Sequence, residues 1–348
     1  MGINSDLSTL QNEGVPVNAE NLFGNLNVGS PQTDPFDRIR VSETQILVDL
    51  NFLYDTQPLL TQTTLVGTGS ATKPTGKSVV VLSTGGTASG AGADFQSKRY
   101  ARYHPGQGTQ VVMTGTIGAY TQYVRSQIGY FDSNNGLFFD MDGTSQGLTG
   151  VPSVTYRTNI TGSVVDTPTL QPNWNVDKLD GTGPSGVTVD WSLPQQFVID
   201  MEWLGVGSVR FGVRLYDDLV YCHIVNFANS SFAPPFINNP NLPCHWAIHN
   251  TGAATAASSI YASCGLIACE GLSDTVANLS FSAQNLAGVT APKLGYKPLI
   301  SISPALLFNG LANRSLIRPK TARVLNDSNN PVYFQILYAY WSNLFFRK

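Results

Sequence analysis

Charged residues are scarce in this sequence, and long apolar runs are absent. Lys, Arg, Asp and Glu make up 12% of its 348 residues, which is about half of the roughly 25% usual for soluble domains. No apolar segment reaches the ~18 residues that a membrane-spanning helix needs. The first residues, MGINSDLSTLQNEG, lack the basic and apolar regions of a signal peptide. We therefore expect no membrane partner, and production in a cytoplasm without secretion.

Basic clusters are missing as well. The net charge is −3, whereas nucleic-acid binding needs grouped Lys and Arg side chains that displace counterions. The densest basic stretch is 98–103, where an extended strand would place Lys98, Tyr100 and Arg102 on one face. Such a face could stack bases, but a partly exposed strand with ion pairs explains it more simply. The sequence predicts no nucleic-acid partner.

Cysteine is limited to four residues without a disulfide-dense spacing, so we expect reduced thiols. With three histidines they form a loose cluster: Cys222-His223, Cys244-His245, His249, Cys264 and Cys269. Zinc is the metal to consider for such a cluster. In an extended strand, however, His245 and His249 would lie about 13 Å apart, too far to share one ion. The sequence predicts no metal site.

Neutral polar residues take the place of charge. Ser, Thr, Asn, Gln and Gly are abundant along the whole chain. A surface built from them is easy to desolvate, because a neutral side chain loses less on burial than a charge does. β-rich proteins also use fewer Lys and Glu residues in general. We interpret the extent of the charge deficit as the mark of a surface made for assembly.

Alternating apolar residues dominate the segment 197–216, which indicates β-strands. The inward-facing sets are Phe197, Ile199, Met201 and Trp203, then Val209, Phe211, Val213 and Leu215. Asp217-Asp218 is expected to form a two-residue turn to the next strand. That register would place Cys222 opposite Val213 in the core. It would place His223 on the outer face.

Similar patterns predict further short strands. We expect them at Ile46–Phe52, Val79–Leu82, Gln96–Tyr103, Gln110–Ile117, Ser126–Phe131, Leu137–Met141, Val151–Asn159, Cys244–His249, Ser258–Glu270 (a pair or one long strand), Lys297–Ile302, Ala322–Asn326 and Val332–Leu337. Residues 63–77, 85–93 and 160–186 are expected to be loops. Asn135-Gly136 is expected to supply the positive φ of a tight hairpin turn.

Short strands at this spacing, without a convincing helix or a heptad repeat, predict an all-β fold. We expect an antiparallel β-sandwich, jelly-roll-like. Residues 1–35 are polar and aperiodic, and we interpret them as an extended N-terminal arm that orders on a neighbour. Residues 36–270 are expected to form the main β-sandwich. Residues 271–348 are expected to form a C-terminal β segment packing on or extending the sandwich.

Asp200 and Glu202 are the residues that could carry hydrolysis. In a strand their side chains would share one face about 7 Å apart, a separation that could suit a glycosidase acid pair. A solvated strand face opposite Arg210 and Arg214 explains the same pattern, and we favour it. No serine nucleophile elbow, Walker loop or complete dinucleotide motif is present. We predict no catalytic residue and no cofactor.

Two loops carry oxygen ligands beside glycine, at Asp132–Gly136 and Asp140–Gly143. Calcium binding would use such oxygens. Neither loop completes the twelve-residue ligand pattern of a calcium loop. Turn formation explains both.

Several strings resemble a known family. They are WNVDKLDGTGPSG at 174–186, WLGVGSVRFG at 203–212, TDPFDRIRVS at 33–42, RYARYHPG at 99–106, GYFD at 129–132, NPNLP at 239–243 and KPLISI at 297–302. Together they resemble a family of virion structural proteins of tailed bacteriophages, over about residues 33–334. Such proteins mostly carry only a virion-component label, so the resemblance is specific for family rather than for function.

The resemblance implies a non-enzymatic virion structural protein, assembled in the host cytoplasm as a capsid decoration, minor capsid or tail-associated component. Its partners would be further copies of itself, with a trimer favoured, and other virion proteins. The arm would lock the assembly by ordering on a partner. We predict an interaction surface that includes Phe23, Phe36, Arg38, Trp174, Asp177, Lys178, Phe232, Phe236 and Trp246.

Two alternative functions remain open. One is a receptor-binding tail fibre or spike adhesin, in which the loops 167–174 and 232–246 expose Tyr and Trp to host surface glycans. The other is a carbohydrate-active enzyme that uses Asp200 and Glu202.

Overall fold

The computed structural model describes residues 44–144, 150–215, 218–229 and 234–270. Beyond these it describes 282–290, 292, 295, 297–313, 317, 321–327, 331 and 333–334. The chain divides into two compact units, Met1–Asp274 and Thr275–Lys348. The predicted N-terminal arm, and with it Phe23, Phe36 and Arg38, lies outside the described residues, as does Phe232.

The first unit contains an eight-stranded antiparallel sheet. Its strands are β1 (Thr44–Asn51), β3 (Ser70–Thr72), β4 (Val80–Ser83), β6 (Thr109–Gly115), β11 (Gln195–Met201), β12 (Ser208–Leu215), β13 (Asp218–Asn226) and β15 (Ser259–Glu270). Their order is β13-β12-β11-β6-β15-β4-β3, and β1 also pairs with β15. Ser259–Glu270 is one long strand, which settles the choice that the sequence left open.

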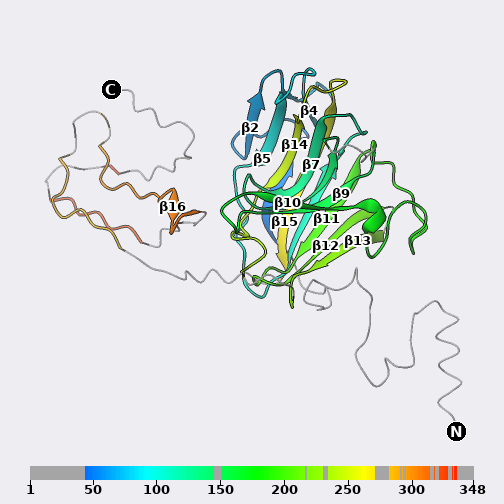
Figure 1. Ribbon diagram of the computed structural model, residues 1–348. Coiled ribbons are helices and arrows are strands. Elements are labelled where there is room, and N and C mark those ends of the chain that lie inside the picture. Colours follow the sequence, from blue (N-terminus) through cyan, green and yellow to red (C-terminus); the bar gives the residue numbers. More distant parts are fainter. Residues whose placement is uncertain are drawn as a thin grey trace, which may run out of the picture. The chain divides into compact units, whose positions relative to one another are not determined.

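A seven-stranded antiparallel sheet forms the second layer (Figure 1). Its strands are β2 (Thr61–Val66), β5 (Gly92–Ser97), β7 (Val124–Phe131), β8 (Gly136–Asp142), β9 (Ser153–Thr158), β10 (Val165–Leu170) and β14 (Cys244–Asn250). Their order is β10-β9-β8-β7-β14-β5-β2. The late strand β14 thus lies between β5 and β7. Two antiparallel sheets with such crossovers form an all-β, jelly-roll-like sandwich, as predicted.

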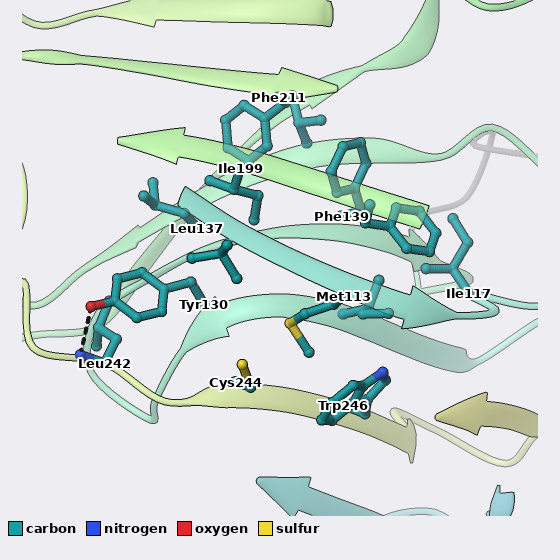
Figure 2. Close-up of a cluster of buried hydrophobic side chains, with 14 of the residues drawn as sticks. Met113, Ile117, Tyr130, Leu137, Phe139, Ile199, Phe211, Leu242, Cys244 and Trp246 are labelled. Carbon is teal, nitrogen blue, oxygen red and sulfur yellow. Dashed lines mark hydrogen bonds between the residues drawn. The ribbon is translucent and has the colours of Figure 1, made fainter. Parts of the chain in front are cut away.

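Aromatic side chains fill the space between the two sheets. Phe139 on β8 contacts Phe197 on β11 and Phe211 on β12, with ring centroids 5.0 and 5.6 Å apart. Figure 2 shows these strands contributing side chains to one cluster. The inward faces predicted for β11 and β12 are therefore confirmed. Burying a side chain of this size stabilises the fold by roughly 1.5–3 kcal/mol.

The turn between β12 and β13 differs from its prediction. Leu215 pairs with Asp218, so Asp218 belongs to β13 and not to the predicted turn, whose other residue, Asp217, lies outside the described residues. A register shift between Phe211 and Gly212 then changes the pairing further along. Val213 pairs with Val220 in place of Cys222, although Cys222 is in the core as expected. The shift pairs His223 with Phe211 and buries it, so the predicted outer-face position is wrong.

The hairpin of β7 and β8 forms as predicted, but by a different turn. Neither Asn135 nor Gly136 has a positive φ. Instead, Oδ1 of Asp132 accepts hydrogen bonds from the backbone N–H groups of Asn134 and Asn135. A short acidic side chain that bonds to the backbone two residues on can replace the glycine conformation.

Several boundaries predicted from the sequence are wrong. β2 overlaps the expected loop 63–77 and β3 lies inside it, because exposed Thr and Gln residues hide the alternation in β2. β10 lies inside the expected loop 160–186; its Pro168 is tolerated because β10 is at a sheet edge. β5 ends at Ser97, so residues 98–103 do not form the expected strand. Residues 297–302 and 322–326 are not strands.

The second unit contains one short hairpin among its described residues. Its strands are β16 (Leu307–Phe308) and β17 (Leu311–Ala312). Of the expected strand 332–337, only residues 333–334 are described, and they are not part of a strand.

The edge of the eight-stranded sheet at β13 is covered by the chain itself. The Nδ2 group of Asn175 donates to the carbonyl of Ile224, and its Oδ1 accepts from the N–H of Ile224, both at 2.9 Å. The N–H groups of Val176 and Asp177 both donate to the carbonyl of Cys222. The segment 174–177 follows a short 3-10 helix, η3 (Gln171–Asn173). It satisfies backbone groups that a bare edge strand would expose.

We predict that Asn175→Ala lowers the free energy of unfolding by roughly 1 kcal/mol, because two hydrogen bonds to the β13 backbone are lost. Urea denaturation followed by tryptophan fluorescence measures this value. Asn173→Ala is the matched control, since its exposed side chain lies two residues away and no loss is expected there. Equal stability of the two variants would show that the Asn175 contact does not hold the edge.

Candidate functional site

Of the five described residues of the predicted interaction surface, four are buried. Trp174, Asp177, Phe236 and Trp246 are among the buried residues, and Lys178 is only partly exposed. Trp246 is 0% exposed and contacts Phe52 and Phe95 in the core (Figure 2 labels Trp246). Trp246 lies on β14, in the middle of the seven-stranded sheet, whereas Trp174 and Phe236 reach the core from segments outside the strands. The predicted exposure of these four side chains is therefore wrong.

Asp177 organises the glycine-rich loop that the resemblance singled out. Its Oδ1 accepts from the N–H of Leu179, and its Oδ2 accepts from the N–H of Ser185. A Cβ at Gly183 would lie 2.2 Å from Oδ1 of Asp177. Glycine is required there because the carboxylate approaches the backbone so closely. The conspicuous string 174–186 is thus a structural device that shapes a loop and covers an edge.

Asp200 is not on a solvated strand face. It pairs with Arg210 as expected, but it is 0% exposed. Its carboxylate accepts hydrogen bonds from the Tyr221 hydroxyl and from Nε2 of Gln110, the latter at 3.1 Å. Arg210 lies over the Tyr221 ring. Arg214 pairs with Gln196, away from Glu202.

Glu202 lies beyond the end of β11 and lines a shallow groove of about 460 Å³. The rim combines the polar residues Ser208, Arg210 and Asn226 with the apolar residues Leu204, Val206 and Ile224. Asp200 does not line this groove. The two carboxylates therefore do not face one shared substrate space.

A carboxylate between two histidines lies on the outer face of the seven-stranded sheet. Asp94 on β5 is opposite Ala247 on β14, and His245 and His249 flank that position. Nε2 of His245 is 3.1 Å from Oδ1 of Asp94, and Nε2 of His249 is 3.0 Å from Oδ2. Strand geometry alone placed the two histidines too far apart to share an ion. The Asp94 carboxylate contacts both histidines because each of its two oxygens faces a different ring.

The surroundings fix this cluster in place. His245 stacks on Phe131 at 4.2 Å, and its Nδ1 lies 3.2 Å from the Phe131 carbonyl. Both ring nitrogens of His245 therefore lie within hydrogen-bond distance of an oxygen. A Cβ at Gly92 would lie 2.3 Å from Nδ1 of His249, so glycine leaves room for that ring.

Asp94 is held in its charged form. Burial alone would raise its pKa, but hydrogen bonds and charge attraction from His245 and His249 outweigh burial and keep the pKa well below its usual value. Among the described residues, no group of His, Cys, Asp or Glu has the geometry of a metal site. All four cysteines are free.

Two arginines neutralise the buried carboxylates of the same face. Arg125 bonds to Asp140 and Asp166, and Arg157 bonds to Asp166. Asp140 is almost fully buried and also accepts from the Ser153 hydroxyl. The oxygens that calcium would have used are engaged by other groups: Asp140 in this network and Asp132 in its turn.

Exposed apolar side chains gather between β1 and the end of β2. Tyr54 is 90% exposed and Leu59 is 74% exposed. We define the edge patch as Leu53, Tyr54, Leu59, Leu60, Leu65 and Val66, all exposed. Hydrogen bonds from the N–H groups of Leu60 and Thr61 to the Gln57 carbonyl hold the loop compact against β2. Sequence reasoning missed this surface, although residues 56–72 contain no charge at all.

Comparisons with known proteins return structures only. No family model and no curated protein matches the chain. It is similar to the carbohydrate recognition domain of Emp47p, with 14% identity, a TM-score of 0.41, and coverage of 66% of this chain and 98% of that one. It is similar to the CBM2 module of the evolved Dit of Lactobacillus casei BL23 phage J-1, with 10% identity, a TM-score of 0.39, and coverage of 65% and 96%.

A Bacillus licheniformis β-glucanase is also similar, with 10% identity, a TM-score of 0.38, and coverage of 67% of this chain and all 100% of that one. These structures share the sandwich architecture. At such low identity and TM-scores they carry no argument about ligand or activity. Within the described part of the chain, no helix is both long and apolar enough to span a membrane.

We predict that Asp94→Asn lowers the free energy of unfolding by roughly 1–3 kcal/mol above about pH 4, because a charged acceptor of two imidazoles is lost. The folded pKa lies below the unfolded one. The stabilisation is therefore fully present above the unfolded pKa and is lost as the pH falls through the folded value.

Urea denaturation of the wild type and the variant from pH 6 down to pH 2 measures this difference. It should shrink at the acid end. Asp218→Asn, at an exposed position, is the matched control and should show no such trend. A difference that stays constant over the whole range would contradict the proposed charge on Asp94.

Proposed function

We propose that this chain is a non-enzymatic virion structural protein of a tailed bacteriophage, and that it works by assembling with itself and with other virion proteins. The observation that carries the proposal is the edge patch, a run of exposed apolar side chains beside an uncharged strand. Exposed apolar surface, where it is contiguous, marks interaction sites on soluble proteins. The resemblance of residues 33–334 to virion structural proteins of tailed bacteriophages is the reason for proposing that this assembly is a virion.

The energetics of the edge patch favour burial against a partner. Covering a side chain such as Leu59 or Tyr54 gains roughly 25 cal/mol for each Å² of apolar area removed from water. The neighbouring Thr and Gln side chains on β2 are uncharged, so a partner can approach without an expensive desolvation. Repetition of one such contact in an assembly supplies avidity.

The described carboxylates support a non-enzymatic role. Asp200 and Asp140 are enclosed and fully engaged by neighbouring side chains. Glu202 faces the groove without a second carboxylate beside it. A hydrolase of the acid-pair type needs two carboxyl groups around one substrate bond. We expect a polysaccharide incubated with the protein to keep its chain length.

Glycan binding is the second candidate function, and the groove at Glu202 is the observation that favours it. Its lining combines the carboxylate of Glu202, the guanidinium of Arg210 and the amide of Asn226 with apolar side chains. Ligand sites commonly combine a few polar groups with apolar side chains in this way. The loops that were expected to expose tryptophan offer no such support, since Trp174 and Trp246 are buried. Binding on a glycan array that disappears in Glu202→Gln would raise this candidate above assembly.

We predict that gold-labelled antibody against this protein binds to virions of the phage that encodes it, as seen by electron microscopy. Label on the head would indicate a capsid decoration, and label on the tail would indicate a tail-associated component. Label only on disrupted virions would indicate an internal component. Absence of label on both intact and disrupted particles would contradict the virion function, with pre-immune serum as the control.

A further inference from the structure

The edges of the two sheets are protected in different ways. β13 is covered by residues 174–177, and β10 carries Pro168. β1 contains a register shift and Asp49, and β3 is only three residues long. Proline, charge, irregularity and shortness are the usual devices that stop a sheet edge from pairing with another chain.

β2 has none of these devices. It is a regular six-residue strand, TQTTLV, at the end of the seven-stranded sheet. Figure 1 shows it beside β5, with no labelled strand of the sheet beyond it. Among the described residues, no strand pairs with its far side. All of its residues except Thr61 are exposed.

The register shows which backbone groups point outward. Thr61 is opposite Ser97, and the N–H of Lys98 donates to the carbonyl of Leu60. Hydrogen-bonded pairs alternate in an antiparallel ladder. Gln62, Thr64 and Val66 therefore bond to β5. The N–H and C=O groups of Thr63 and Leu65 point to the free edge.

We propose that β2 pairs in antiparallel fashion with β2 of a second copy of this chain, so that the two seven-stranded sheets join into one. This inference rests on the proposed assembly function and names its contact. A two-fold axis beside Thr64 sets Thr63 opposite the partner subunit's Leu65. Four backbone hydrogen bonds then use every outward group of these two residues in both copies.

Charge argues for a second copy as the occupant. Residues 56–72 contain no charged residue, so two copies meet across the axis without opposing like charges, which would otherwise be destabilising. The edge patch residues Leu65 and Val66 lie on the strand itself, and in this register they are opposite the partner subunit's Thr63 and the partner subunit's Gln62, which are uncharged. The contact is isologous and two-fold. It gives a dimer in place of the trimer that the sequence favoured.

Cysteine cross-linking of the full-length protein tests the register. Facing residues of a non-hydrogen-bonded antiparallel pair have Cα atoms about 4.5 Å apart, within the range that a disulfide spans. We expect Thr64→Cys to give a covalent dimer on mild oxidation, because Thr64 faces its own copy across the axis. Thr63→Cys is the matched control and should cross-link no more than the wild type, whose Cys264 is exposed.

Sedimentation equilibrium tests the hydrogen bonds. Thr63→Pro removes an outward N–H and should weaken self-association by at least about tenfold, while proline is tolerated at such an edge position. Thr63→Val keeps the N–H and should associate like the wild type. Circular dichroism shows whether both variants are folded. If Thr63→Pro does not fold, cross-linking of Thr64→Cys still tests the pairing.

A monomeric wild type at all concentrations, or equal cross-linking of the two cysteine variants, would overturn the pairing. Gold labelling of virions is independent of these results. Virions that carry the label while Thr64→Cys fails to cross-link would mean that the pairing is wrong and the assembly function stands. Cross-linking of Thr64→Cys without label on virions would mean that the pairing is right and the virion function is wrong.

Discussion

Backbone hydrogen bonding at the sheet edges is the constraint on which this molecule depends. A sandwich of two open sheets leaves a row of N–H and C=O groups at each edge, and each row must be paired, covered or left to water. Asn175 and its neighbours cover β13 with side-chain and backbone groups. β2 is regular and neutral, and no strand among the described residues pairs with its outer edge. Because the chain covers the β13 edge, the edge of β2 stands out as a place where a partner strand can pair.

Several of the few charged side chains pair with one another in the folded protein. Arg125, Arg157, Asp140 and Asp166 neutralise one another on a single sheet face. Asp94 is likewise engaged by His245 and His249. These charges hold neighbouring strands together. The side chains of β2 itself are apolar, hydroxyl or amide groups, so a partner meets no charge on that strand.

Periodicity predicted the fold class and the inward faces of β11 and β12, because their large apolar residues recur at every second position. It missed β2, whose exposed Thr and Gln residues give no apolar signal. It misplaced the pairing of Phe211 with β13, because one extra residue in a strand leaves no mark on composition. Aromatic residues in loops suggested a surface, yet Trp174 and Trp246 close the core. The pairing of Asp94 with two histidines depends on strands far apart in sequence, which no local pattern reveals.

β15 lies in the middle of the eight-stranded sheet, with β6 on one side and β1 and β4 on the other. Those three neighbours precede it by well over a hundred residues. During synthesis they leave the ribosome long before their shared partner exists. The sheet therefore closes only after Glu270 has emerged, which makes this sandwich a late-folding unit with a high contact order. Its first strands must stay soluble until then, a task for which their neutral, hydroxyl-rich surfaces are suited.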